Sequence, residues 1–162
     1  MNAMTTSHTA TVTLPSDTTI LITREFAAPA HLVYRTWTEP ELIKRWWAGS
    51  RGTVDSIDVD LRVGGAWRYV MTANAGFQVA FHGEYREIVP NERLVSTEVY
   101  EEVPDDYAID TATFVEVDGR TTLTVLVEHT NQIARDMHIN SGMEGGMQEA
   151  LDLAEQIAVS LA

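Results

Sequence analysis

The sequence contains no cysteine. This absence excludes disulfides, thiol nucleophiles and cysteine-ligated metal sites. No apolar run approaches the roughly 18 residues that a bilayer-spanning helix needs. The opening residues, "MNAMTTSHTATVTLPSDT", have neither a basic start nor an apolar stretch, so they are not typical of a signal peptide. We therefore expect a cytoplasmic protein whose residues 1–17 form a disordered tail.

Positive charge is scarce as well. The chain carries 11 lysines and arginines against 24 acidic residues, a net charge of −13, and Lys44 is its single lysine. Nucleic acids and anionic membranes bind basic surfaces, so we expect neither as a partner. The one local basic cluster, formed by Arg35, Lys44, Arg45 and Arg51, fits a solvated helix surface better than an anion site.

What remains is typical of one globular domain. The 162 residues are 44% hydrophobic and 22% charged, which is enough to bury a core without metal or disulfide. No repeat, low-complexity tract or linker interrupts the chain after the expected tail. We therefore expect a single domain over residues 18–162.

The spacing of apolar residues predicts the order of elements. Residues 18–26, "TTILITREF", alternate and predict a strand. The period then changes, and residues 29–47 predict two short helices, because Pro29 and Pro40 each suit the first turn of a helix. Alternation returns between residues 57 and 129 in segments joined by short turns, and such segments must pair as antiparallel strands.

The last 22 residues are the best helix candidate. At about 100° per residue, Met143, Met147 and Leu151 share an apolar arc, with acidic and amide side chains opposite. A sheet of about six to seven antiparallel strands with one apolar face needs a cover. This helix is the only predicted element long enough. The fold class is therefore α+β, a curved antiparallel sheet around a long C-terminal helix, with two short helices after the first strand.

Three of the first six residues of this helical segment are glycine, an unusual start for a helix. Ser141 and Glu144 have the spacing of a capping box, which predicts that the helix begins at Ser141. Gly142 is then the expected bend after a separate short helical turn. A side chain at Gly146 would be expected to meet the sheet. Two interpretations stay open there, a close helix–sheet approach or a mouth through which a ligand enters.

Five strings along the chain resemble known sequences. They are "ITREFAAPAHLVYRTWTEPELIKRWW" (22–47), "DVDLRVGGAWRYVM" (58–71), "GEYREIVPNERLVSTEVYEE" (83–102), "GRTTLTVLV" (119–127) and "ARDMHINSGMEGGMQEALDLAEQI" (134–157). In this order they resemble the START/Bet v 1-like (SRPBCC) superfamily. The resemblance is strongest to the bacterial stand-alone proteins that are similar to the C-terminal domain of Aha1, the activator of the Hsp90 ATPase (AHSA1 family).

The resemblance implies the helix-grip fold of that superfamily, with a deep cavity between the concave face of the sheet and the long helix. Many relatives use this cavity to hold an apolar or aromatic small molecule, such as a lipid, a polyketide or a flavonoid-like compound. The resemblance carries over no catalytic residue set and no cofactor. It also makes a homodimer and a contact with Hsp90 expectations for this chain.

The alternating strands predict which residues line such a cavity. Trp67 and Tyr69 share the inward face of one strand, and Phe77, Phe81 and Tyr85 share that of the next. Ligand pockets are typically apolar and aromatic with a few polar groups, although each single aromatic also fits ordinary core packing. The expected lining is Trp37, Trp46, Trp47, Trp67, Tyr69, Met71, Phe81, Tyr85, Glu98, Tyr100, His129, Met143, Gly146 and Met147.

The strand "LVSTEVY" has two phases. In one, Val95 and Val99 face inward and the strand is ordinary. In the other, Glu98 and Tyr100 face inward, and Glu98 becomes a buried carboxylate beside a phenol, a signal of a functional site. Asp110 on the next strand has the same ambiguity. The sequence leaves both phases open.

None of the five histidines has the spacing of a zinc site, so we expect no metal. His129 is in phase with inward-facing valines and is expected either at the cavity mouth or as a hydrogen-bonded structural residue. No nucleophile elbow, phosphate loop or dinucleotide fingerprint occurs. The expected function is to bind a hydrophobic or aromatic small molecule. The alternatives are a cyclase-like or hydrolase-like enzyme using Glu98 or His129, or an Hsp90 co-chaperone in a stress response.

Overall fold

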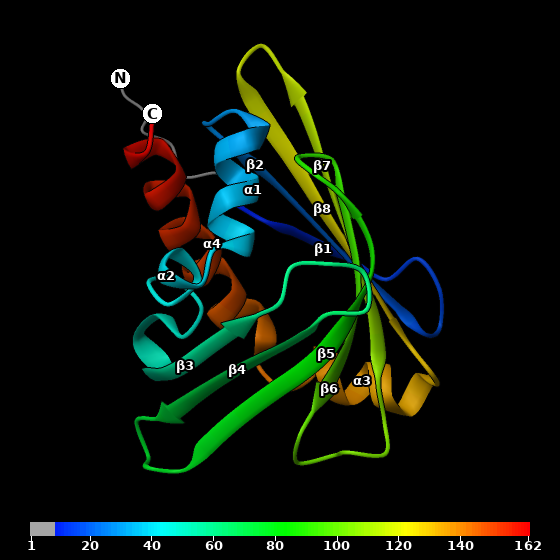
Figure 1. The fold of residues 1–162 in the computed structure, drawn as a ribbon. Coiled ribbons are helices and arrows are strands. Elements are labelled where there is room, and N and C mark those ends of the chain that lie inside the picture. Colours follow the sequence, from blue (N-terminus) through cyan, green and yellow to red (C-terminus); the bar gives the residue numbers. More distant parts are fainter. Residues whose placement is uncertain (1–8) are drawn as a thin grey trace.

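The computed structural model describes residues 9–162 (Figure 1). Its elements are β1 (Thr11–Thr13), β2 (Thr19–Phe26), α1 (Ala30–Thr38), α2 (Pro40–Ile43), the 3₁₀ turn η1 (Gly49–Arg51), β3 (Gly52–Val59), β4 (Ala66–Ala73), β5 (Gln78–Val89), β6 (Arg93–Tyr100), β7 (Ala108–Val117), β8 (Arg120–His129), α3 (Gln132–Ile139) and α4 (Met143–Ser160). The predicted α+β class is confirmed. Within the described range the sheet has eight strands, slightly more than expected.

The strands follow the order β1-β2-β8-β7-β6-β5-β4-β3, and every neighbouring pair is antiparallel. Short turns connect the strands from β3 to β8 as successive hairpins, while β2 joins the far side of β8. Figure 1 shows the sheet bending around α4, with α1 and α2 beside α4 and α3 at the lower edge. This arrangement is the helix grip that the resemblance implied.

The additional strand, β1, lies inside the expected tail. It pairs with β2, with Val12 opposite Ile22. Just before it, the backbone of Ala10 exchanges two hydrogen bonds with the side-chain amide of Gln148 on α4, at 2.9 and 2.8 Å. The segment is too short to show an alternating pattern, and its order comes from these distant partners. Residues 1–8 of the expected tail lie outside the described residues.

The core fills one end of the grip, between α1, α4 and the strands around β2 and β8. Phe26, Val33 and Leu123 are almost completely buried there, and so is Ala154 of α4. Arg24 is buried with them. It donates hydrogen bonds to the Leu151 carbonyl at 3.0 Å and to the carboxylates of Asp152 and Glu155 at 2.8 and 3.1 Å. These bonds fasten β2 to the middle of α4.

The start of α4 differs from the prediction. Gly142 is the bend between α3 and α4, as predicted, with a positive φ of 83° that suits glycine. The capping box is wrong. Ser141 Oγ donates to the His138 carbonyl at 2.6 Å and so closes α3, and Gly142 precedes α4 without a side-chain cap. The left-handed turn at Gly142 separates Ser141 from the amides of α4.

The first half of α4 is held by η1. A Cβ at Gly146 would lie 2.8 Å from the guanidinium of Arg51, so this glycine faces η1 and not the sheet, contrary to expectation. The Ser50 backbone and hydroxyl both donate to Glu149, at 2.9 and 3.0 Å. Space on the helix surface at Gly146 is therefore filled by an arginine side chain from η1.

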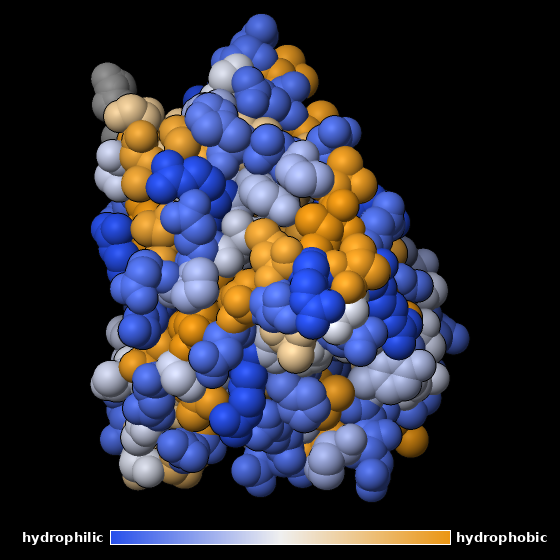
Figure 2. Space-filling model, viewed as in Figure 1, coloured by the Kyte–Doolittle hydropathy of each residue, from blue (hydrophilic) through white to orange (hydrophobic). Residues whose placement is uncertain are grey.

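Hydrophobic side chains form several patches on the face shown in Figure 2. The connection between β3 and β4 crosses in front of the sheet in Figure 1, and Figure 2 shows hydrophobic side chains gathered on the same part of the surface. Leu61 and Val63 of this connection are exposed. Phe77 is also exposed, at 59%, because it lies in the turn before β5 and not on the strand. Its predicted inward position is wrong.

Candidate ligand-binding site

A continuous series of aromatic rings lines the half of the concave face formed by β4, β5 and β6. The ring centroids are 4.8 Å apart for Trp67 and Tyr69, 5.4 Å for Tyr69 and Trp47, 5.9 Å for Trp47 and Phe81, and 5.1 Å for Phe81 and Tyr100. These separations are those of favourable aromatic pairs. We call these five residues the aromatic wall.

Strand register explains the wall. Phe81 of β5 is paired with Tyr69 on one side and with Tyr100 on the other, and directly opposed residues of antiparallel strands share a face. Trp67 is opposite Gly83, where a Cβ would lie 2.6 Å from the indole nitrogen. The glycine leaves room for Trp67 Nε1 to donate to the Thr97 carbonyl at 3.2 Å.

The wall is accessible although it faces inward. Trp67 is buried, but Trp47, Tyr69 and Phe81 are half-buried and Tyr100 is exposed at 39%. Inward-facing side chains that are covered by close packing would be sealed from water, as they are around Ala154. Solvent therefore reaches this half of the concave face.

Two carboxyl groups stand beside the wall. Leu94 of β6 is buried, and Ser96 is opposite both the buried Tyr85 and Asp110. These pairings select the phase of β6 in which Glu98 faces inward, and they place Asp110 of β7 on the same face. Glu98 is near enough to Asp110 for its charge to raise the pKa of Asp110.

Burial dominates the electrostatics of this pair. It raises the pKa of Asp110 well above its usual range, and the charge and hydrogen bond of Glu98 raise it further. Asp110 Oδ1 is buried and has no hydrogen-bond partner among the described residues. Burial also raises the pKa of Tyr69, with smaller contributions from the charges of Tyr85, Glu98 and Asp110.

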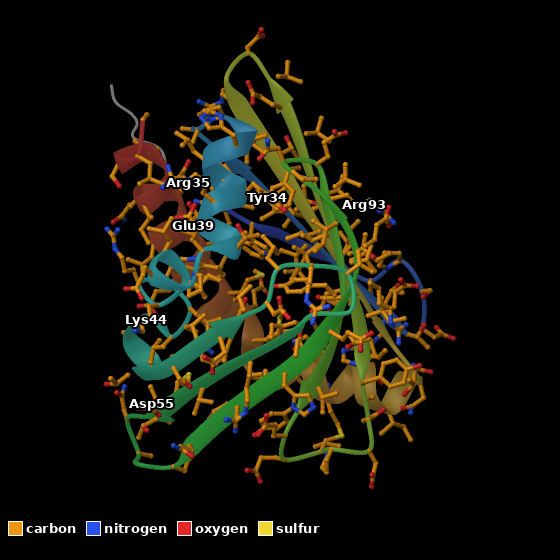
Figure 3. All side chains as sticks on the ribbon, viewed as in Figure 1. Tyr34, Arg35, Glu39, Lys44, Asp55 and Arg93 are labelled. Atoms are coloured by element: carbon orange, nitrogen blue, oxygen red, sulfur yellow. The ribbon has the colours of Figure 1, made fainter. Side chains whose placement is uncertain are left out.

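Two further tyrosines extend the polar edge of the site. Burial raises the pKa of Tyr85 to about 12, and the nearby Tyr34 adds to the effect. Tyr34 comes from α1, and Figure 3 shows it between that helix and the sheet. Its ring meets Phe114 edge-on at 5.6 Å. Figure 3 also shows Arg35 of this helix and Glu39, the residue that follows it, on the side away from the sheet, where they form an exposed ion pair.

A pair of histidines joins β8 to α3. His129 Nε2 and His138 Nδ1 are 3.0 Å apart, which requires one nitrogen to donate and the other to accept. Burial lowers the pKa of both imidazoles, and the charge of Glu98 acts in the opposite direction on each. His129 is therefore a hydrogen-bonded residue, one of the two expected alternatives. Its partner was missed because no sequence spacing links residues on a strand and a later helix.

The remaining predicted residues occupy different places. Trp37 and Trp46 stack on each other at 4.8 Å, and Trp46, which is buried, donates from Nε1 to the Thr36 carbonyl, so these two rings form a pair of their own beside the core. Met71 is buried on β4. Met143 and Met147 are half-buried on the first half of α4. Gly146 lies under Arg51, as described above.

Other kinds of site find no support in the part of the chain that the structure describes. No group of three or more histidine, aspartate or glutamate side chains there could hold a metal ion. No helix within residues 9–162 is long and apolar enough to cross a membrane. A surface pocket of about 240 Å³ includes Thr97 and Val99 of β6, which face the opposite side of the sheet from Glu98. It is separate from the aromatic wall.

Comparison with known proteins agrees with the fold. A protein from Rhodobacter sphaeroides is 24% identical, with a TM-score of 0.86 over 94% of this chain and 99% of that chain. Proteins from Nitrosomonas europaea and Mycobacterium smegmatis are 25% and 26% identical, with TM-scores of 0.82 and 0.80, and cover 91% and 94% of this chain and 98% and 97% of their own. No curated protein sequence matches.

The family comparison covers most of the domain. Residues 27–158 match the family described as activator of Hsp90 ATPase homolog 1-like protein. This range begins just after β2 and ends near the end of α4, so it contains the aromatic wall and the carboxyl pair. The chain therefore belongs to the family of activator of Hsp90 ATPase homolog 1-like proteins.

Proposed function

We propose that this protein binds a hydrophobic or aromatic small molecule on the concave face of its sheet, beside the first half of α4. The observation that carries the proposal is the aromatic wall, which faces inward and yet stays open to solvent. Leaving large aromatic rings half-buried sacrifices part of the free energy of full burial, which is roughly 1.5–3 kcal/mol for a large apolar side chain that starts fully exposed. A ligand that covers the wall restores this contribution.

The surroundings of the wall fit the same function. Ligand sites combine an apolar surface with a few polar groups that fix orientation, and Glu98, Asp110 and Tyr69 supply such groups at one end. Met143 and Met147 add flexible apolar side chains on the helix. Lipids, polyketides and flavonoid-like compounds are ligands with a matching apolar or aromatic body.

Thermal-shift screening of these three compound classes tests the proposal. A ligand is expected to raise the melting temperature and to change the fluorescence of Trp47, whose ring lies within the wall. Phe81→Ala removes one ring of the wall and should weaken binding about tenfold, as expected for the loss of roughly 1.4 kcal/mol of contact. Phe77→Ala is the matched control, because Phe77 is exposed only a few residues away. Equal effects of the two substitutions, or no stabilising compound, would contradict the proposal.

The carboxyl pair favours one alternative, an enzyme that acts on the bound molecule. A carboxyl that keeps its proton beside a second carboxyl is an arrangement suited to general acid–base catalysis. If the protein is a cyclase-like or hydrolase-like enzyme, Glu98→Gln and Asp110→Asn should abolish turnover of a bound compound and leave its binding intact. Unchanged turnover in both variants excludes these residues as the catalytic groups.

A further inference from the structure

The position of Asp110 poses a problem that the rest of the chain does not solve. Its Oδ1 atom is buried without a hydrogen-bond partner among the described residues. Buried polar atoms nearly always have partners, and an unpartnered one is costly. The charged group that acts on Asp110 is a second carboxyl, that of Glu98. A carboxyl cannot supply the positive charge that would stabilise an ionised Asp110. A group that donates hydrogen bonds to Asp110 is missing from this face.

No basic side chain of the protein supplies that group. All 11 lysines and arginines lie within the described residues, and none of them contributes to the pKa of Asp110. Most form ion pairs elsewhere, namely Arg24, Arg35, Lys44, Arg62, Arg68, Arg93, Arg120 and Arg135. Arg51 donates to the backbone carbonyls of Ala48 and Trp47, and Arg45 and Arg86 are exposed. His129 and His138 bond to each other.

The surfaces next to the carboxyls suit a cation. The charges of Glu98 and Asp110 both act on Tyr69, which is also the second ring of the aromatic wall. The faces of tyrosine, tryptophan and phenylalanine rings attract ammonium groups. Glu98 is two positions from Tyr100 on the same face of β6, and Asp110 of β7 is opposite Ser96. A molecule lying along the wall from Tyr69 to Tyr100 would therefore meet a negatively polarised ring surface and then the two carboxyls.

We propose that the ligand of this site is a hydrophobic amine. Its ammonium group binds the carboxyls of Asp110 and Glu98, and its apolar or aromatic part lies along the aromatic wall. The inference rests on the proposed function and names the chemical class of the ligand. Recognition combines charge-assisted hydrogen bonds from the ammonium to the carboxylates with contacts between the ligand's body and the rings.

Binding should release a proton. In the free protein the Asp110 carboxyl holds its proton to higher pH than an exposed carboxyl. The amine binds as R–NH₃⁺ and favours the carboxylate, so the Asp110 proton passes to the solvent and the other bonds stay as they were. Affinity is therefore expected to rise with pH until Asp110 is ionised in the free protein or the amine loses its own proton. Glu98 and Tyr69 are the titratable groups that face Asp110, and His129 and His138 face Glu98.

Calorimetric titration with matched probes tests the inference. The probes are tryptamine, tryptophol and indole-3-propionate, together with decylamine, decanol and decanoate, so that within each set only the charge of the head group changes. The amine should bind at least tenfold more tightly than the alcohol, and the carboxylate should bind most weakly. Titration in buffers of different ionisation enthalpy should show proton release for the amines, decreasing as pH rises, and none for the alcohols.

Substitutions locate the effect. Asp110→Asn should remove the preference for the amine and the proton release, with the affinity for the alcohol retained, and Glu98→Gln should reduce the preference in part. Asp105→Asn, at an exposed acid in the β6–β7 connection, is the control and should change neither. Tight binding of the alcohol or the carboxylate, or an amine preference that survives both substitutions, overturns the amine inference and leaves the proposed function standing. Binding of none of the six probes counts against both.

Discussion

The two halves of α4 are packed in different ways. In the second half, Ala154 and Ala158 are completely buried, because small side chains let the helix approach its neighbours closely. In the first half, Met143 and Met147 stay half-buried, and this half is held by η1. The difference indicates that one half of the helix closes the core and the other leaves the aromatic wall accessible. The second half of α4 therefore contributes mainly to stability, and the first half lies beside the proposed binding site.

The polar groups of the two ends differ in the same way. Arg24 in the closed half is surrounded by acceptors, the Leu151 carbonyl and the carboxylates of Asp152 and Glu155. Asp110 in the open half retains a buried oxygen without a partner in the described chain. A satisfied buried charge stabilises a fold, whereas an unsatisfied buried acceptor is a place where a ligand gains free energy.

The largest effect on stability is expected from removing the hydrogen bonds by which Arg24 of β2 holds the second half of α4. Arg24→Ala leaves Glu155 and the Leu151 carbonyl without their buried donor, and should lower the free energy of unfolding by about 3 kcal/mol. Chemical denaturation measures this change. Arg93→Ala removes an exposed ion pair with Glu87 and should cost less than about 1 kcal/mol. Similar losses for the two variants would show that the Arg24 anchor does not hold the closed half.

A smaller effect on stability is expected from Asp110, beside the aromatic wall, where substitution should raise the free energy of unfolding. Because the pKa of Asp110 is raised in the folded state, the unfolded chain loses this proton first as pH rises. The contribution of Asp110 to stability is therefore fully present below its unfolded pKa and declines with rising pH, by up to about 1.4 kcal/mol per pH unit, until the folded pKa is passed.

The variant Asp110→Asn isolates the contribution of Asp110 to the pH dependence of stability. Its free energy of unfolding should exceed that of the original protein by about 1–2 kcal/mol at pH 8 and by less at pH 5, since asparagine does not titrate. Denaturation curves at the two pH values provide the comparison, with Asp105→Asn as an exposed control. A difference that stays constant between pH 5 and pH 8 would contradict the raised pKa.

The histidine pair provides a further test, since it joins α3 to the end of β8 near Glu98. Both imidazoles have lowered pKa values in the folded state, so the unfolded chain takes up protons first as pH falls. Stability from the pair is present above the unfolded pKa of about 6.5 and is lost below it. His138→Gln should reduce the loss of stability between pH 7 and pH 5 by about 1 kcal/mol.

Hydrogen exchange of the α3 amides is the local measurement for that pair. Exchange in α3 should accelerate as pH is lowered beyond the intrinsic change in exchange rate, and less so in His138→Gln. Ile133→Ser is the matched control on the same helix, because Ile133 is 75% exposed. If both variants keep the full pH dependence, the two histidines do not tie α3 to β8.

The sequence was sufficient for the fold because the fold rests on local periodicity. Alternation over β2 to β8 and the helical arc of α4 are properties of consecutive residues. β1 and Phe77 were misassigned, since Ala10 is ordered by Gln148 across the fold and Phe77 lies one residue before β5.

The candidate site was predictable only in part. The rings of β4 and β5 follow from strand phase, and Trp47 from its place after α2. The phase of β6 depends on the pairing of Ser96 with Asp110, and the histidine pair depends on where α3 returns to the sheet. These contacts are properties of the folded chain. Trp37 and Trp46 were assigned to the site by residue type, although they stack on each other and Trp46 is buried in the core.

The smallest expected effects separate the two glycines at the start of α4. Nothing lies within 4 Å of a Cβ at Gly145, so Gly145→Ala should raise the free energy of unfolding by about 0.5–1 kcal/mol, the usual gain of helix propensity. At Gly146 a Cβ would meet the guanidinium of Arg51 at 2.8 Å, so in Gly146→Ala the displacement of Arg51 should cancel most of that gain.

Binding then distinguishes the two interpretations of Gly146. The larger Gly146→Leu must move Arg51 and η1, which leads into β3 beside the aromatic wall. If the start of α4 is the mouth of the site, Gly146→Leu should slow ligand association at least severalfold, as measured by stopped-flow fluorescence, while Gly145→Ala leaves the rate unchanged. If Gly146 serves only close packing against Arg51, Gly146→Leu should lower stability without changing the association rate. The association rates of the two variants distinguish an entrance for the ligand from simple packing against Arg51. Strain at η1 alone has no reason to change how fast a ligand reaches the aromatic wall.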